Sequence, residues 1–130
     1  MSSYNIKYLD SGDVDQSGRL IHPDVASGIA LVMIMSGGCG HCTAAKPAFH
    51  NYADKFGGDN TKSNISVLYV EADGGGASLL QSVGKVWDVQ YFPTYKVFND
   101  GNAVSTTQPK DRSTIGLYNF VSDHAVDKII

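Results

Sequence analysis

The sequence is poor in cysteine, has no excess of positive charge and lacks any long apolar run. Its 130 residues include 10 Lys and Arg against 13 Asp and Glu, for a formal net charge of −3, and the cations form no cluster. We therefore expect no nucleic-acid partner. The longest apolar run, residues 29–35, is far shorter than the roughly 20 residues that a membrane-spanning helix needs, so we expect no membrane partner either.

Signals that direct a protein to secretion are also missing. The first residues contain no apolar segment of the signal-peptide kind, and the last five contain no retrieval signal. We expect a chain that is not secreted: cytoplasmic, packaged in a virus particle, or a domain excised from a larger protein. The length of 130 residues and the hydrophobic content of 42% predict a single domain over residues 1–130.

The two cysteines of the chain, Cys39 and Cys42, are separated by only two residues. They follow the apolar run 29–35 and begin a segment, residues 39–56, that is predicted to be helical. A C-x-x-C pair at a strand-to-helix junction indicates a redox site first and half of a metal site second. Because a helix N-terminus favours negative charge, we expect Cys39 to ionise and attack, and Cys42 to be the more buried thiol.

Two metal sites are the alternatives to be weighed. Zinc would have to recruit, at spacings that no zinc motif supports, two of the histidines His22, His41, His50 and His124. Asp13, Asp15 and Ser17 match the calcium-loop spacing of an EF-hand. Gly12 and Pro23, however, interrupt the flanking segments where that motif needs helices. A solvated acidic turn is the favoured interpretation, and we predict no metal.

Apolar spacing and turn residues predict the remaining elements. Strands are expected over residues 4–9, 29–35, 65–71, 94–98 and 103–107, and further helices over 77–87 and 113–124. Residues 99–102 form a predicted hairpin turn, and Trp87 is expected in the core. The apolar stripe of the last helix consists of Ile115, Leu117, Phe120 and Val121. This order predicts an α/β fold, a mixed four- to five-stranded sheet with helices on both faces.

Several motifs together resemble the thioredoxin fold, and most closely the catalytic a-type domains of protein disulfide isomerases. The resemblance spans about residues 29–124, with residues 1–28 as an atypical N-terminal segment. Its anchors are Cys39-Gly40-His41-Cys42, Lys46-Pro47, Phe92-Pro93-Thr94, Asn99-Asp100-Gly101 and Arg112. The resemblance implies a thiol–disulfide oxidoreductase without cofactor or metal. It would act on protein substrates with thiols or disulfides, and would need an unidentified redox partner.

The resemblance also implies roles for the residues of the cysteine motif. Cys39 would be the nucleophile, and Cys42 the resolving thiol that attacks the mixed disulfide. His41 can place positive charge beside the thiolate, which stabilises the reduced form and makes the disulfide more oxidising. Gly40 completes this isomerase-like site.

Residues far along the chain would complete the site. Pro93 resembles the family's proline that follows a cis peptide bond and packs against the cysteines. Phe92 and Thr94 would pair with the backbone of an extended substrate. Arg112 resembles the loop arginine that modulates the resolving thiol, although a plain surface charge is an equal alternative.

Three positions depart from the family's pattern. Met33 stands where the family has a buried acid, Tyr69 where it has the lysine paired with that acid, and Gly38 where it has a tryptophan. The loss of both charges is self-consistent, because either one alone would be buried unpaired. Since neither Met33 nor Tyr69 readily accepts the Cys42 proton, we predict mixed disulfides that resolve slowly, and faster at higher pH. A thioredoxin-like binding module or adaptor with slow or vestigial turnover is therefore the alternative function.

Overall fold

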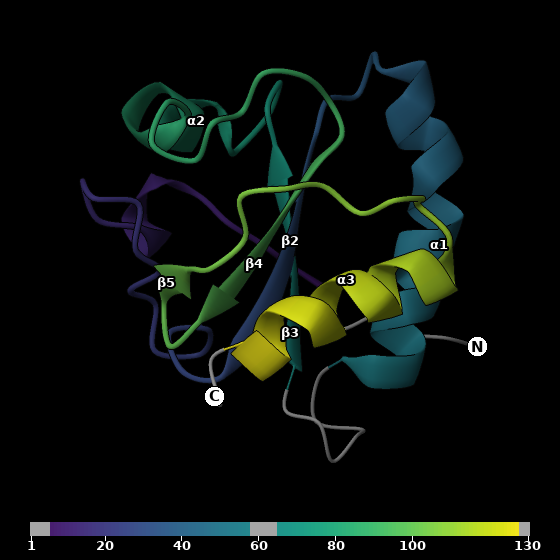
Figure 1. The fold of residues 1–130 in the computed structure, drawn as a ribbon. Helices are drawn as coiled ribbons and strands as arrows, with labels where there is room; N and C mark the ends of the chain where they lie inside the picture. The colour runs from purple at the N-terminus through teal and green to yellow at the C-terminus, as the bar shows by residue number, and fades with distance from the viewer. Residues whose placement is uncertain (1–5, 58–64, 128–130) are drawn as a thin grey trace.

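The computed structural model describes residues 6–57 and 65–127, and its strands form one sheet (Figure 1). The sheet has five strands in the order β1-β3-β2-β4-β5. Strands β1, β3 and β2 are parallel neighbours, whereas β4 is antiparallel to both β2 and β5. The bounds are β1 Ile6–Tyr8, β2 Ile29–Met35, β3 Ile65–Glu71, β4 Thr94–Asn99 and β5 Asn102–Ala103. The predicted mixed sheet is confirmed; residues 4 and 5 of the predicted first strand lie outside the described residues.

Helices cover both faces of this sheet, as the sequence predicts (Figure 1). They are α1 Gly40–Phe56, α2 Ala77–Val83 and α3 Thr114–Asp127, with a short 3-10 helix, η1, over Ser11–Asp13. One core cluster packs α1 and α3 against one face. The second cluster packs α2 and residues 9–25 against the opposite face.

Strand β2 lies in the middle of the sheet because it has no polar face to expose. Leu31, Met33 and Met35 belong to the cluster under α1 and α3, whereas the residues between them belong to the cluster under α2. Alternate residues of a strand point to opposite faces, so a strand covered on both sides must be apolar throughout. The end of β2 therefore leads the chain from the core directly to the cysteine motif.

Residues 9–25 contribute more to the core than their divergence from the family pattern indicates. Leu9, Val14, Leu20 and Val25 are all buried in the second cluster. The Leu20 N–H donates to the Gly101 carbonyl at 2.9 Å, which joins this segment to the hairpin at the opposite end of the sheet. The segment thus closes one face of the sheet.

Helix α2 is shorter than predicted, since it ends at Val83 and residues 84–88 form turns. Asp88, with a φ of 58°, has the left-handed backbone that ends this run of turns. Trp87 is nevertheless buried as predicted, and its indole N–H donates to the Gly18 carbonyl at 2.9 Å. Its backbone N–H donates to the Val83 carbonyl at 2.9 Å, so the turn after α2 and the contact with Gly18 together position this residue.

The predicted strand over residues 103–107 is wrong beyond Ala103. The Val97 N–H donates to the Ser105 hydroxyl at 2.9 Å, and the Tyr95 N–H donates to the Gln108 side-chain oxygen at 2.8 Å. Side chains thus take the hydrogen bonds that a longer β5 would have made along the edge of β4. This replacement ends the ladder early.

The apolar stripe predicted for α3 is correct except at Ile115. Leu117, Phe120 and Val121 are buried against the sheet and α1, but Ile115 is 72% exposed. Residues that are two positions apart in a helix lie about 200° apart around its axis, so Ile115 faces away from Leu117. Residues 114, 117, 120 and 121 form the inward face instead.

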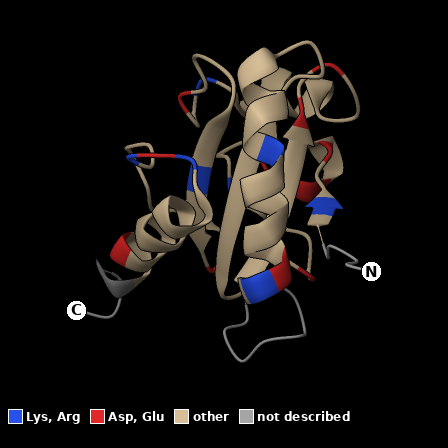
Figure 2. Ribbon diagram, turned by 90° about the vertical axis from the view of Figure 1, so that its right-hand side faces the viewer, with Lys and Arg blue, Asp and Glu red and all other residues tan. Residues whose placement is uncertain are grey.

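The charged residues of the described chain are dispersed. In the ribbon of Figure 2, the Lys and Arg segments are scattered over α1, strands and loops, with Asp and Glu segments among them. Among residues 6–57 and 65–127, no helix combines the length and the apolar character that crossing a membrane requires.

Candidate active site

The cysteine pair sits at the start of α1. Cys39 is the N-cap, and its Sγ accepts the Cys42 N–H at 3.0 Å. Both cysteines are free thiols; Cys39 is half-buried and Cys42 is buried, so the predicted order of exposure is confirmed. A sulfur that caps a helix receives the unpaired N–H groups and the positive end of the helix dipole.

The two thiols are electrostatically unequal. The hydrogen bond from the Cys42 side chain lowers the pKa of Cys39 most; the backbone N–H groups of Cys42 and His41 and the charge of Arg112 add to this, against partial desolvation. Burial raises the pKa of Cys42, and its hydrogen bond to Cys39 raises it further. Cys39 is therefore the thiol that ionises first, and Cys42 holds its proton.

The loop that precedes Cys39 is held by a residue that the sequence analysis missed. The Gly37 N–H donates to both carboxylate oxygens of Asp73, at 3.0 and 2.9 Å. Asp73 lies in the loop after β3, between the strand predicted over residues 65–71 and the helix predicted over residues 77–87. The Asp-Gly-Gly-Gly composition of residues 73–76 gave no signal that this carboxylate fixes the approach to the cysteines.

Phe92 brings its backbone carbonyl to the sulfur of Cys39, and Pro93 follows it directly in the sequence. The Phe92–Pro93 peptide bond is cis. The Cys39 Sγ lies 3.5 Å from the Phe92 carbonyl oxygen and donates to it, and Pro93 is buried. The Thr94 hydroxyl donates a hydrogen bond to the Tyr91 carbonyl at 2.6 Å. Residues 53 positions apart in the sequence thus meet at the sulfur of Cys39.

The remaining site residues are at the surface. Gly40, His41 and Arg112 are all exposed. Arg112 acts on the two cysteines only through its charge, which lowers the pKa of each as the smallest contribution. At Gly38, a Cβ would have no atom within 4 Å, so the missing tryptophan leaves open space above the site.

The departure at Met33 leaves a row of aromatic side chains beneath Cys42. Met33 is fully buried and lies in register with Tyr69 on β3 and with Tyr95 on β4. The Tyr69 hydroxyl lies 2.8 Å from Nε2 of His50, which comes from α1. Sequence reasoning considered His50 only as a zinc ligand.

The carboxylates of Asp13 and Asp15 hold the acidic turn together by accepting hydrogen bonds from within it. Asp13 Oδ2 accepts the Asp10 N–H at 2.8 Å, and Asp15 Oδ1 accepts from Ser17 and Arg19. The interpretation as a solvated turn is wrong for Asp13, which is buried as part of the cap of η1. Within the described residues, no group of three or more His, Cys, Asp or Glu side chains lies close enough to share a metal ion.

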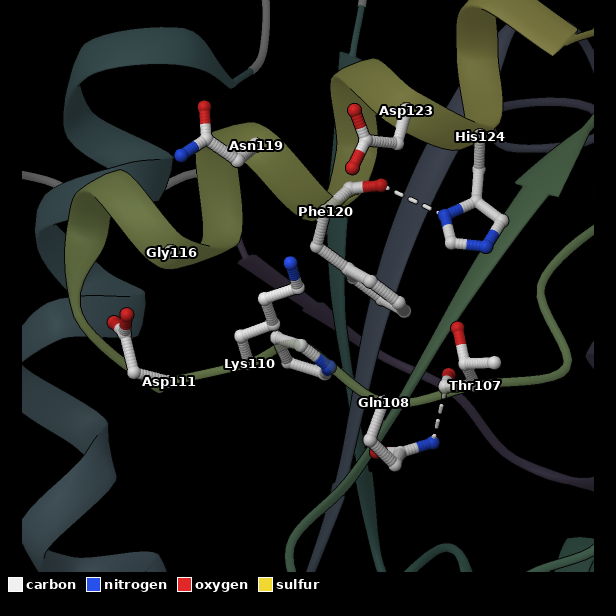
Figure 3. Close-up of a pocket in the computed structure, with 10 residues that line it drawn as sticks. Thr107, Gln108, Lys110, Asp111, Gly116, Asn119, Phe120, Asp123 and His124 are labelled. Atoms are coloured by element: carbon white, nitrogen blue, oxygen red, sulfur yellow. Dashed lines mark hydrogen bonds between the residues drawn. The ribbon is translucent and has the colours of Figure 1, made fainter.

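A hollow of about 330 Å³ lies between α3 and the loop before it (Figure 3). Phe120 extends across it and His124 stands at one side, with its Nδ1 2.8 Å from the Phe120 carbonyl oxygen. None of the predicted site residues lines this hollow. A neighbouring hollow shares residues 108–111 with it and is also lined by Tyr91, Tyr95 and Arg112.

Comparison with known proteins places this geometry in a family. The sequence profile of the thioredoxin family matches residues 21–123. The thioredoxin-like protein 453L of Invertebrate iridescent virus 6 is 29% identical over 126 residues, covering 89% of this chain and 91% of that protein.

Solved structures share the fold at lower identity. The first thioredoxin domain of mouse protein disulfide-isomerase A4 has a TM-score of 0.66 at 20% identity, covering 96% of this chain and 79% of that one. Malassezia sympodialis thioredoxin has a TM-score of 0.64 at 19% identity, covering 96% and 95%. Human ERp44 in its zinc-bound form has a TM-score of 0.69 at 18% identity; 92% of this chain is covered, but only 30% of the longer ERp44 chain. The chain belongs to the thioredoxin family.

Proposed function

We propose that this chain is a protein thiol–disulfide oxidoreductase, a single domain with an isomerase-like site made by Cys39, Gly40, His41 and Cys42. The observation that carries the proposal is the asymmetry of the pair. Cys39 caps α1 with its sulfur, and hydrogen bonds lower its pKa, whereas Cys42 is buried with a raised pKa. This is the arrangement that a nucleophile and a resolving thiol require.

The reaction transfers two electrons to the substrate. The Cys39 thiolate attacks one sulfur of a substrate disulfide, the substrate S–S bond breaks, and the other substrate sulfur leaves as a thiolate. Cys42 then loses its proton and attacks the Cys39 sulfur, which releases the second substrate thiolate and leaves a Cys39–Cys42 disulfide. An unidentified dithiol partner would reduce that disulfide. In isomerisation, a substrate thiolate attacks the mixed disulfide instead and no electrons are transferred overall.

Substrate binding is proposed for the residues beside the cis peptide bond. An extended chain would lie along Phe92, Pro93 and Thr94, where the Phe92 carbonyl already faces the Cys39 sulfur. The hollow lined by Tyr91 and Arg112 adjoins this segment and supports a groove for the flanking residues of a substrate. A relative encoded by an iridescent virus supports packaging in a virus particle as the location.

The alternative function is an adaptor that holds a partner through one long-lived mixed disulfide. The open space at Gly38 favours it, because a flat apolar contact surface for varied substrates is absent there. Repeated turnover separates the two functions.

We expect the chain to reduce many equivalents of a protein disulfide in the presence of a dithiol reductant, and to restore activity to a protein with scrambled disulfides in a glutathione buffer. The buried Cys42 can attack the Cys39 sulfur of the mixed disulfide and release the substrate, so the catalytic cycle can be completed. Turnover is measured as product formed per chain. A burst of one equivalent followed by a stable covalent complex would favour the adaptor.

His41→Ala tests the isomerase-like character. In the structure the His41 backbone N–H acts on Cys39, and alanine keeps it, so the variant isolates the imidazole. Without the imidazole of His41 near the thiolate, we expect the reduction potential to become more negative by about 15–30 mV, roughly a three- to tenfold change in the equilibrium with glutathione. His22→Ala is the matched control, and an unchanged potential in His41→Ala would assign no redox role to the His41 side chain.

A further inference from the structure

The Cys42 thiol must lose a proton in a cluster to which, among the described residues, no buried carboxylate belongs. Its side chain is buried in the cluster formed by α1, α3 and the sheet, and its pKa is raised by burial. The residue directly beneath that helix, Met33, has no polar hydrogen-bonding group. The proton therefore leaves through another group in the same cluster or waits for hydroxide from solvent.

Two tyrosine hydroxyls flank Met33 in this cluster. Tyr69 and Tyr95 are each 1% exposed, pair with Met33 from its two neighbouring strands and pack against the same ring, that of Phe49. A negative charge on Cys42 raises the pKa of both tyrosines, after the larger effect of burial. The Cys42 thiol and the hydroxyls of Tyr69 and Tyr95 therefore lie in one buried region, where solvent screens their charges poorly.

The hydroxyl of Tyr95, in the same buried region, is a hydrogen-bond donor that is not used. Among the residues that the structure describes, its buried hydroxyl has no hydrogen-bond partner. A buried hydroxyl without a partner is costly, so its retention calls for an explanation. A thiolate forming at Cys42 would supply an acceptor, and the charge of Arg112 also acts on this tyrosine.

Tyr69 connects the same region to the surface. Its hydroxyl is hydrogen-bonded to His50 Nε2 at 2.8 Å, and the two rings meet edge to face at 5.9 Å. His50 is half-buried on the exposed side of this contact. Burial lowers the pKa of His50, and the neighbouring charge of Lys46 lowers it further. His50 is therefore neutral at pH 7 and able to accept a proton.

We propose that Tyr69 and His50 carry the proton of Cys42 to solvent, and that Tyr95 donates a hydrogen bond to the sulfur as it ionises. This inference rests on the proposed function. It gives the chain a tyrosine–histidine route in place of the carboxylate that the resemblance leads one to expect. Tyr69 and His50 act as proton-transfer residues, and Tyr95 as a positioning residue.

The proposed step is balanced. The Cys42 S–H proton passes to the Tyr69 oxygen, directly or across one water molecule, while the Tyr69 proton passes to His50 Nε2 and forms an imidazolium. The Cys42 thiolate then attacks the Cys39 sulfur, and the bond between Cys39 and the substrate sulfur breaks. The substrate leaves as a thiolate, and the imidazolium releases its proton to solvent.

The pH dependence follows from the charge of His50. Above its lowered pKa, His50 is neutral and accepts the proton, so the resolution rate should be nearly flat between pH 7 and 8. This replaces the sequence-based expectation of a rate that rises with pH, which considered Tyr69 without its hydrogen bond to His50. Below that pKa the imidazolium accepts nothing, and the rate should fall. The groups that also face this route are Cys39 and Arg112 beside Cys42, Lys46 beside His50, and Tyr8 and Glu71 beside Tyr69.

Stopped-flow reaction of the reduced chain with 5,5′-dithiobis(2-nitrobenzoate) between pH 5 and 9 tests the route. The first equivalent of thionitrobenzoate reports attack by Cys39, and the second reports resolution by Cys42. We expect His50→Gln and Tyr69→Phe each to slow the second phase by about tenfold to a hundredfold at pH 7, within the range of general-base effects. Both variants should also become steeply pH-dependent, about tenfold per pH unit, as resolution comes to depend on the raised pKa of Cys42.

Controls separate this role from a structural one. Tyr52→Phe also removes a buried hydroxyl from the same cluster, but burial and Tyr118, not Cys42, raise the pKa of Tyr52, so its second phase should be unchanged. Tyr95→Phe should slow the second phase without changing the shape of the pH profile.

Two results would overturn the inference while leaving the proposed function intact. The first is that His50→Gln and Tyr69→Phe both keep the second-phase pH profile of the unmodified chain, whether that profile is flat or steep. The second is a steep profile produced by His41→Gln and not by His50→Gln. Loss of the first phase in the unmodified chain would overturn the proposed function as well.

Discussion

Cys39→Ser is expected to abolish disulfide turnover, whereas Cys42→Ser is expected to stop the reaction at a covalent complex. A serine hydroxyl is not ionised at neutral pH and does not attack a disulfide, so without Cys39 the first bond cannot form. We expect turnover to fall by at least about a thousandfold, to the background of the assay, as for loss of a covalent nucleophile. With Cys39 kept and Cys42 replaced, the mixed disulfide forms but loses its resolving thiol.

Non-reducing electrophoresis and mass spectrometry of the chain mixed with a disulfide-containing protein distinguish these outcomes. Cys42→Ser should accumulate one equivalent of a complex that a reductant releases, and Cys39→Ser should form none. Cys39 is half-buried and at a helix terminus, so its replacement should leave the unfolding temperature nearly unchanged. A complex trapped by Cys39→Ser and not by Cys42→Ser would reverse the roles of the two thiols.

Met33→Glu is expected to destabilise the fold strongly at pH 7. Met33 is 0% exposed and lies in register between Tyr69 and Tyr95, neither of which carries positive charge. An uncompensated buried carboxylate costs about 3–5 kcal/mol. For a chain of this length, that cost lowers the unfolding temperature by roughly 10–20 °C.

The direction in which the stability of Met33→Glu changes with pH identifies the cause of its destabilisation. Burial raises the pKa of the introduced carboxyl above its unfolded value of about 4.3, so the penalty is full at high pH. The penalty shrinks as the pH falls through the raised pKa of the folded state, because the carboxyl is then neutral in the fold. Met33→Leu conserves volume and polarity and should cost less than about 1.5 kcal/mol. If both variants were equally stable from pH 4 to pH 8, a cation or water would have to reach this position.

The local pattern of the sequence was sufficient for the sheet and for the cysteine pair. The predicted strands at residues 29–35 and 65–71 match β2 and β3, because a short, largely apolar run that contains β-branched residues favours a strand covered on both faces. Helix α1 follows its predicted range to within one residue, since the apolar periodicity and the glycine that ends it, Gly57, are local.

The errors lie where tertiary contacts replaced a local preference. Trp87 lies in the turns after α2, where its indole donates to the Gly18 carbonyl. Ser105 and Gln108 ended β5 by bonding to the edge of β4 with their side chains. Ile115 is an error of another kind: it was assigned to the inward face of α3 because it is apolar, although local helix geometry turns it outward. Composition alone does not encode these choices.

The sequence by itself determined that a thiol pair begins a helix at the end of a buried strand, because residues three apart in a helical turn meet without help from the rest of the chain. Only the tertiary structure decided what surrounds that pair. The Phe92 carbonyl at the Cys39 sulfur, the Asp73 carboxylate on Gly37 and the Tyr69–His50 hydrogen bond each join distant segments. Their contacts depend on strand register and on the packing of α1 across the sheet, and a shift of one residue in register would turn each strand side chain to the opposite face.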